Sequence, residues 1–169
     1  MLQLPRTAGC LVCGPHNPLS FGLHFFVDAE GTVTADFTPA PEHIGFDRVT
    51  HGGVVATVLD EAMVWAAIWA GKRGCLAAEL AVRYRSPGAV GVPLKVEARV
   101  HLFRSRLIQT ASRLMMGDRV VAEATAKYIP VPLDEHERIL ATFIPDAASV
   151  EARRALGDPT ALAGGGGVG

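Results

Sequence analysis

The feature that most constrains this chain is the run of residues 52–70, which predicts one long helix with apolar side chains on nearly every side. Such a helix has no face suited to water, so the rest of the fold must cover it. Its longest uninterrupted apolar stretch, residues 62–71, is much shorter than the roughly 20 residues that cross a bilayer. We therefore expect a buried core helix that ends at Gly71 and Gly74.

Strand patterns surround this helix. Apolar and polar residues alternate along residues 76–85 and 94–102, which is typical of half-buried strands. Two short strands are expected at residues 23–28 and 32–37, and a hairpin at residues 107–116 and 119–129. One buried helix among five to six antiparallel strands is an α+β arrangement. The sheet must curl round the helix, because no second helix is predicted to cover it.

Size and charge narrow the functional classes. The 169 residues are enough for one domain, placed at residues 1–145, and a short helix with a flexible glycine-rich tail at 146–169. Sixteen Lys and Arg against 17 Asp and Glu give a net charge of −1, unlike the basic balance of nucleic-acid-binding domains. The N-terminus lacks the apolar run of a signal peptide. We expect a cytoplasmic protein with neither a nucleic-acid nor a membrane partner.

The helix begins with an unusual His51-Gly52-Gly53 sequence. The first amides of a helix have no intrahelical acceptor and lie at the positive end of its dipole. Glycines leave those N–H groups open, so a ligand carbonyl placed there would be polarised as in an oxyanion hole. The alternative is that Gly52 and Gly53 merely let the preceding loop pack closely against the helix.

Asp60 is the second candidate on this helix. On a helical wheel it shares a face with small residues, which leave room for a substrate. An ionised carboxylate in the interior must be paired or hydrated. The alternative interpretation is a buried hydrogen-bonding group that fixes a loop.

The spacing of these candidates predicts the composition of the site. Gly52 and Asp60 are eight residues apart, so along one helix they are separated by about 12 Å. A reacting carbonyl must lie about 3 Å from both its attacking group and its oxyanion donor. If both residues are catalytic, the site takes Gly52 from one chain and Asp60 from another, as in a two-fold dimer.

Several motifs together resemble a known family. They are His51-Gly-Gly-(x)6-Asp60-Glu61, the strand from Ala78 to Pro87, and Gly91-Val-Pro-Leu94. This combination is similar to the hotdog-fold acyl-CoA thioesterases, in the branch like the phenylacetate-pathway and 4-hydroxybenzoyl-CoA thioesterases. The leader Cys10-Leu-Val-Cys13-Gly14 also resembles one found in part of that superfamily. The resemblance spans about residues 10–130.

The resemblance implies a fold, a reaction and an assembly. The hotdog fold wraps an antiparallel sheet around one long helix, and two units pair into a continuous sheet. The substrate is an acyl-CoA, hydrolysed by a homodimer or a dimer of dimers without a metal or redox cofactor. In the family, the Gly52 position polarises the thioester carbonyl through its N–H, and the Asp60 position of the facing subunit acts as base or nucleophile. His51 would orient the substrate or the loop.

Two positions depart from the family pattern. Relatives often have Ser or Thr where this chain has Ala77, and others have Asn where it has Gly45. Glu79, two residues beyond Ala77 and expected on the same strand face, is the nearest replacement. The departures leave open a non-catalytic acyl-CoA-binding protein. A hotdog hydratase or dehydratase fits less well, because its carboxylate normally lies at the start of the helix.

Further candidates surround these positions. Gly53 and Glu61 are possible substrate contacts, although Glu61 points about 100° away from Asp60 and can instead pair structurally with a backbone group or an arginine. Arginine matches the geometry of phosphate groups, so four arginines are candidates for binding the phosphates of coenzyme A: Arg83, Arg85, and Arg104 and Arg106 at the tip of a hairpin. The alternative is that these arginines are simply solvated. Trp65 and Trp69 are expected in the core or in the wall of an acyl pocket.

The cysteines give a weaker indication. Cys10-x-x-Cys13 with His16 close by invites a zinc interpretation, but no second pair or convincing fourth ligand follows. Three cysteines are an odd count for a disulfide framework, and a redox role is not expected without a βαβ context. We therefore expect no metal and assign Cys10 and Cys13 to packing of the N-terminal loop.

Overall fold

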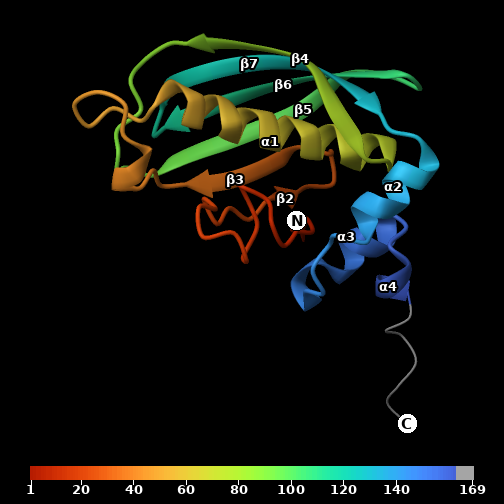
Figure 1. Ribbon diagram of the computed structural model, residues 1–169. Helices are drawn as coiled ribbons and strands as arrows, with labels where there is room; N and C mark the ends of the chain where they lie inside the picture. The colour runs from red at the N-terminus through yellow and green to blue at the C-terminus, as the bar shows by residue number, and fades with distance from the viewer. Residues whose placement is uncertain (163–169) are drawn as a thin grey trace.

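The computed structural model describes residues 1–162 and shows one long helix crossing the concave face of an antiparallel sheet (Figure 1). The sheet has seven strands in the order β1-β2-β3-β5-β6-β7-β4. The strands are β1 (Leu2–Gln3), β2 (Phe26–Val27), β3 (Val33–Phe37), β4 (Cys75–Tyr84), β5 (Leu94–Arg104), β6 (Leu107–Met116) and β7 (Arg119–Pro130). This confirms the predicted α+β architecture with one central helix.

The central helix, α1 (Gly52–Gly71), has almost the bounds predicted from its apolar run. Val58, Leu59, Ala62 and Met63 are fully enclosed, and α1 packs on β3, β4, β5, β6 and β7. It ends at Lys72, whose φ of 50° turns the chain out of the helix. By length and composition α1 is apolar enough to span a bilayer, but half of its most apolar window is buried in the fold, as expected of a core helix.

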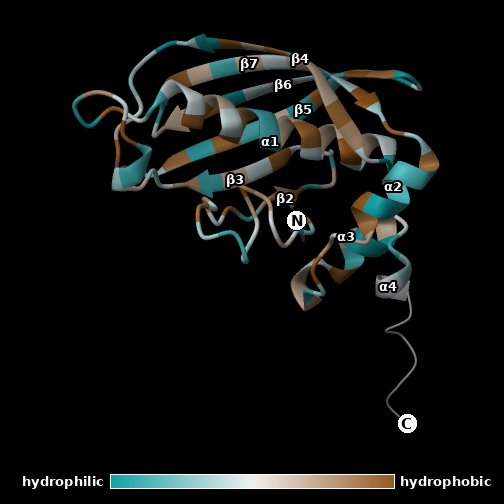
Figure 2. Cartoon of the chain, viewed as in Figure 1, coloured by the Kyte–Doolittle hydropathy of each residue, from teal (hydrophilic) through white to brown (hydrophobic). Residues whose placement is uncertain are grey.

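The strands present alternating side chains to α1 and to the outside. Figure 2 shows this as alternating apolar and polar bands along the strands. Val96 and Ala98 of β5, Leu114 of β6 and Tyr128 of β7 are all buried. Period-two alternation with the apolar set on one face is what a sheet covered on one side requires.

The N-terminal segment differs from its prediction. Residues 23–28 were expected to form a strand, but β2 contains only Phe26 and Val27. The backbone before it pairs elsewhere: Leu23 N–H donates to Val12 O, and Leu4 N–H donates to Phe25 O. The leader of residues 1–25 therefore folds back along the sheet edge and supplies the unpredicted strand β1.

The C-terminal segment contains more helix than expected. A short 3₁₀ turn precedes the loop to α1 at Pro41–His43, and after β7 come α2 (Leu133–Leu140), a 3₁₀ turn at Ala147–Ser149, α3 (Val150–Ala155) and α4 (Pro159–Leu162). The predicted short helix beyond residue 146 is confirmed by α3. Figure 1 shows these helices at one end of the molecule, beside the N-terminal segment.

The C-terminal helices share contacts with the main body. Ala152 and Leu156 belong to the same apolar cluster as α1, and Asp146 binds Gln3 and Arg6 of the leader. A division at residue 145 stays a prediction, and the predicted glycine-rich tail at 163–169 lies outside the described residues.

Candidate functional site

His51 is the N-cap of α1. Its Nδ1 accepts a hydrogen bond of 2.9 Å from the Gly53 N–H. His51 therefore caps the helix, and the bond occupies the Gly53 amide, which is a candidate substrate contact. A Cβ at Gly53 would lie 3.0 Å from His51 Nδ1, so glycine lets this cap close.

The Gly52 amide is left open by this arrangement. No described residue accepts a hydrogen bond from the Gly52 N–H, and it lies at the positive end of a helix of 20 residues. The carbonyl of Gly52 accepts a hydrogen bond of 2.7 Å from the Tyr84 hydroxyl, which ties strand β4 to the start of α1. A Cβ at Gly52 would lie 3.3 Å from that hydroxyl oxygen, so glycine allows the tyrosine to approach closely.

Asp60 is held by a residue that the sequence had not indicated. Tyr128 of β7 donates its hydroxyl to Asp60 Oδ1 at 2.5 Å and also lies 3.0 Å from the Asp60 carbonyl oxygen. Tyr128 is fully buried, and its pKa is raised by burial and then by the hydrogen bond to Asp60. The tyrosine therefore remains a neutral donor, and Asp60 keeps a second, partly accessible oxygen.

The position of Tyr128 bears on the missing hydroxyl at Ala77. The two residues are directly paired across β7 and β4, so their side chains lie on the same face of the sheet. The tyrosine thus brings a hydroxyl to the Asp60 carboxylate from the strand next to Ala77. The only sequence signal for Tyr128 is the strand alternation of β7, which places its side chain inward. No local signal connects it with Asp60.

Glu79 does not replace that hydroxyl, and the prediction that it shares a face with Ala77 is wrong. A bulge between Ala77 and Glu79 shifts the register, so Glu79 pairs with Lys127 rather than with an inward residue. Its carboxylate binds Lys127 Nζ at 2.7 Å on the exposed outer face. The extra residue of the bulge reverses the alternation that the sequence pattern assumed.

The other departure, Gly45, also has a structural reason. A Cβ at Gly45 would lie 3.1 Å from the Cα of His51, and the Gly45 N–H donates to Val49 O. The glycine therefore lets the loop before α1 close against the helix start.

Glu61 faces away from Asp60, toward the N-terminal leader. Its Oε1 accepts a hydrogen bond from Trp65 Nε1 at 3.1 Å and lies 3.7 Å from Cys10 Sγ. Burial, followed by the Cys10 charge, raises the pKa of Glu61 to about 8. The partners of Glu61 are thus an indole and a thiol, not the backbone group or arginine of the alternative interpretation.

The predicted phosphate-binding arginines lie on the outer face of the sheet. Arg83 pairs with Glu123 across β4 and β7, and Arg85 forms an ion pair with the same Glu123 at 2.6 Å. Arg104 and Arg106 are exposed at the β5–β6 turn. The structure brings none of them to Gly52 or Asp60 of the same chain.

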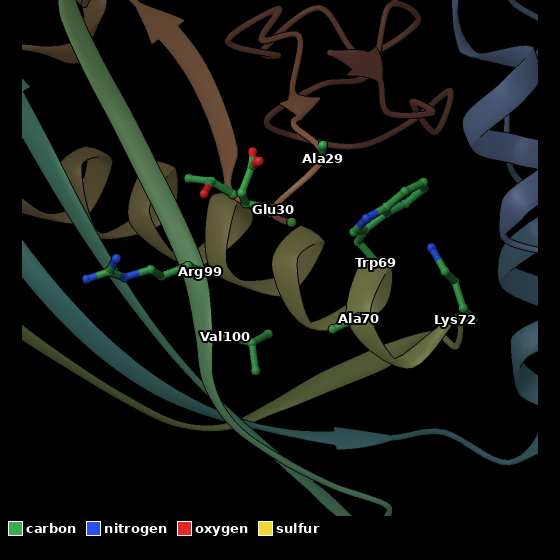
Figure 3. A pocket seen from close by; sticks show the side chains of 9 residues that line it. Ala29, Glu30, Trp69, Ala70, Lys72, Arg99 and Val100 are labelled. Carbon is green, nitrogen blue, oxygen red and sulfur yellow. The ribbon is translucent and has the colours of Figure 1, made fainter.

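Two cavities lie away from these residues. One, of about 490 Å³, is lined by Glu30, Trp69, Lys72 and Arg99 among others, at the C-terminal end of α1. In Figure 3 Trp69 and Lys72 lie side by side while Arg99 points away from them, and the Lys72 ammonium lies 3.2 Å from the Trp69 ring centre. Trp65, by contrast, is buried in the core, against Phe143. The second cavity, of about 580 Å³, includes Cys10.

Within one chain, Gly52 and Asp60 do not meet. Both lie on α1, and eight residues of helix separate them by about 12 Å. One edge of the sheet is β4, which carries Leu76, Leu80 and Tyr84 with 62%, 39% and 54% of their surfaces exposed. An unpaired edge strand with exposed apolar side chains is a surface suited to another chain.

Comparison with known proteins shows similarity to thioesterases. The family model described as the thioesterase superfamily matches residues 48–110, which contain α1, β4, all of β5 and the start of β6. Acyl-coenzyme A thioesterase THEM4 of Xenopus laevis is 29% identical over 107 residues, which are 62% of this chain and 48% of that protein. The chain thus spans about half the length of this curated relative.

Solved structures share the fold. A crystal structure of a thioesterase superfamily protein is 26% identical with a TM-score of 0.67, over 71% of this chain and 62% of that chain. The E. coli PaaI protein, from the phenylacetic acid degradation operon, is 18% identical with a TM-score of 0.62, over 66% of this chain and 81% of that chain. The family resemblance inferred from the motifs is confirmed: the thioesterase-superfamily model matches residues 48–110, and the chain shares its fold with solved thioesterase-superfamily structures.

Proposed function

We propose that the protein is a thioester hydrolase that converts an acyl-CoA to the free acid and coenzyme A. The observation that carries this proposal is the α1 helix itself. It holds an unengaged Gly52 N–H at its positive end and, two turns on, the Asp60 carboxylate fixed by Tyr128. A polarising amide and an oriented carboxylate are the two groups that hydrolysis of a thioester requires.

The proposed site is completed by a second copy of the chain. Its support is the 12 Å between Gly52 and Asp60 on one helix, together with the exposed β4 edge. Pairing along β4 would continue the sheet across a two-fold axis and place two identical sites at the seam. A dimer, or a dimer of dimers, is the assembly that this requires.

The proposed chemistry uses no metal or redox cofactor. The thioester carbonyl oxygen accepts the Gly52 N–H of one chain, which stabilises the negative charge of the tetrahedral intermediate. Asp60 of the facing chain takes a proton from water, and the resulting hydroxide adds to the carbonyl carbon. The carbon–sulfur bond then breaks, and the departing thiolate receives the proton from Asp60. Direct attack by Asp60 through an acyl anhydride is the other route.

The remaining roles follow from this placement. His51 fixes the helix start through its bond to Gly53, and Tyr84 holds the Gly52 peptide from its carbonyl side. Arg83 is the outer-face arginine that we propose for the phosphates of coenzyme A, because Arg85 is already paired with Glu123. We propose a cytoplasmic location, where acyl-CoA substrates and reduced thiols occur together.

A hydrolysis panel tests this function. The purified chain is incubated with short, long and aromatic acyl-CoAs, and released coenzyme A is measured with a thiol reagent. We expect turnover of at least one class and its loss, by about 100-fold or more, in Asp60→Asn. Label found in Asp60 after a single turnover in H₂¹⁸O would show the anhydride route with water attack on the Asp60 carbonyl, because the general-base route places the label only in the free acid.

Two outcomes of the same panel would favour other functions. Tight binding of acyl-CoA without release of coenzyme A indicates a non-catalytic binding protein. Hydration of an enoyl-CoA with the thioester left intact indicates a hydratase. Either outcome overturns the proposed hydrolysis.

A further inference from the structure

A second group of reactive side chains joins the N-terminal leader to the opposite side of α1. The sulfurs of Cys10 and Cys13 and a carboxylate oxygen of Glu61 all lie within 4.8 Å of one another. The two cysteines belong to one turn, closed by a hydrogen bond from the Gly14 N–H to Cys10 O. Glu61 comes from α1, 51 residues from Cys10, so the fold and not the local sequence assembles the group.

The two thiols are in different surroundings. Cys10 Sγ accepts hydrogen bonds from the N–H groups of Val12 at 3.3 Å and Cys13 at 3.5 Å, whereas the Cys13 side chain is buried. Backbone donors of this kind stabilise a thiolate. The pKa of Cys10 is lowered to about 5, first by a hydrogen bond from the Cys13 thiol, and that same bond and burial raise the pKa of Cys13.

Cys10 is also partly exposed. It lines the cavity of about 580 Å³ between the leader residues 7–10 and residues 141–145 after α2. A small disulfide in this cavity would meet Cys10, with Cys13 and Glu61 behind it. Cys75 offers a contrast within the same chain, because burial raises its pKa to about 11.

We propose that Cys10 and Cys13 form a redox-active dithiol that exchanges with low-molecular-weight disulfides, with Cys10 as the attacking sulfur and Cys13 as the resolving sulfur. Two cysteines three residues apart in one turn can reach disulfide geometry without moving other elements. The site is separate from the proposed thioester hydrolysis, and its chemistry is measured without any acyl-CoA.

The exchange balances in two steps. The Cys10 thiolate attacks a disulfide RS–SR, a Cys10–SR bond forms, and the departing RS⁻ takes the proton of the Glu61 carboxyl. The Glu61 carboxylate then takes the proton of the Cys13 thiol, and Cys13 attacks Cys10 Sγ and expels the second RS⁻, which takes that proton from Glu61. Two protein thiol groups are oxidised to one disulfide, and RS–SR is reduced to two RSH.

A metal ion is a weaker interpretation of the same cluster. Within residues 1–162 no fourth His, Cys, Asp or Glu joins these three, whereas structural zinc sites have four protein ligands. Thiol–disulfide exchange also uses one thiolate beside one protonated, buried thiol. A closed metal site would remove this difference, because both sulfurs would bind the metal as thiolates.

The test follows the thiols of the full chain. The reduced protein is exposed to oxidised glutathione at pH 7, quenched with N-ethylmaleimide, digested and analysed by mass spectrometry. We expect the peptide that carries Cys10 and Cys13 to lose two hydrogens, while Cys75 is alkylated normally. Before oxidation, Cys10 should react with iodoacetamide at least about 100-fold faster than Cys75, because far more of it is thiolate.

Two variants make the roles distinguishable. Cys13→Ser should accumulate a stable glutathione adduct at Cys10, and Glu61→Gln should prolong the same adduct about tenfold with a rate that rises with pH. Cys10 reacting no faster than Cys75 would overturn the proposal, and so would one tightly bound zinc ion per chain that protects both thiols. Glutathione release from Glu61→Gln at the wild-type rate would contradict the proton transfer.

Discussion

Asp60 and Tyr128 show how a catalytic candidate is fixed by a partner far away in the chain. The two residues are 68 positions apart, and the 2.5 Å hydrogen bond joins the middle of α1 to β7. Because Tyr128 is buried and neutral, it orients one oxygen of Asp60 and leaves the other for water. The same helix turn sends Glu61 to the leader, so two adjacent carboxylates have separate tasks.

Replacing Tyr128 by phenylalanine tests this orientation. Loss of a buried hydrogen bond to a carboxylate should lower the free energy of unfolding by about 1–2 kcal/mol and lower kcat about tenfold. Tyr84→Phe is the matched control for stability, since its hydroxyl binds a carbonyl at a half-exposed position and should cost less than about 1 kcal/mol. Urea unfolding and steady-state hydrolysis measure both. Equal stability losses, with kcat unchanged in Tyr128→Phe, would contradict this role.

Glu61 and Cys10 couple stability to pH in opposite directions. With a pKa raised from 4.5 to about 8, Glu61 holds a proton in the folded state that the unfolded chain releases, so its contribution to stability falls as pH rises between these values. Cys10, with a pKa lowered from 9.0 to about 5, makes a contribution that grows as pH rises from about 5 to 9.

The two contributions should largely cancel in the wild type. As far as these two groups are concerned, we expect the melting temperature of the wild type to stay nearly constant between pH 5 and pH 8. In Cys10→Ser it should fall as pH rises, because the loss of stability from Glu61 is no longer offset by Cys10. Scanning calorimetry across this range provides the measurement. Parallel pH profiles of the two proteins would show that the cluster does not carry these protons.

At the scale of elements, the N-terminal leader is an ordered, packed part of the fold. Gly14 closes the Cys10 turn, and a Cβ there would lie 2.4 Å from Cys10 N and 2.5 Å from Cys10 O. Both are backbone atoms, so the turn itself must shift to make room. This explains why glycine follows Cys13 in the leader.

Gly14→Ala should therefore lower the free energy of unfolding by about 1–3 kcal/mol. Gly9→Ala is the matched control in the same leader, because a Cβ at Gly9 meets nothing within 4 Å and should change stability by less than about 0.5 kcal/mol. Denaturant unfolding of the two variants checks the difference. Similar curves for both would mean that the turn is not tightly packed.

The elements that the sequence predicted well are those with a regular period. Residues 52–70 and the long strands were found almost at their bounds, because helix and strand patterns of ten or more residues leave little ambiguity. The strand predicted at residues 23–28 is too long and β1 is not predicted, because the leader's backbone pairs with distant segments, such as Thr7 with Phe143. Glu79 was placed on the wrong face because a bulge of one residue cannot be recognised from alternation.

The candidate site was predicted in part. The start of α1 and Asp60 were identified from glycines and a carboxylate in an apolar helix, which are local signals. Tyr128 and the Cys10–Glu61 contact were missed, because each depends on a pairing made across the fold rather than along the chain. Cys10 and Cys13 were assigned to packing because their third neighbour lies on α1.

At the scale of the whole molecule, the proposed hydrolysis requires two chains to share each site. Gly52→Pro is a suitable probe of the amide, because it removes the N–H. Proline is tolerated at the first position of a helix. The residue before it, His51, already has the extended backbone that proline requires, with φ of −57° and ψ of 134°. Gly52→Ala keeps the N–H and is the control for contact with Tyr84. Removal of one oxyanion donor should cost about 100-fold or more in kcat.

Subunit complementation between Gly52→Pro and Asp60→Asn tests the central claim most directly. The two inactive chains are co-expressed with different tags, and the mixed population is assayed for acyl-CoA hydrolysis. If each site takes Gly52 from one chain and Asp60 from the other, a mixed dimer contains one intact site, and random pairing restores about a quarter of wild-type activity. If both residues act within one chain, every site in the mixture is damaged, and an activity that stays at the level of the separate variants would contradict the account.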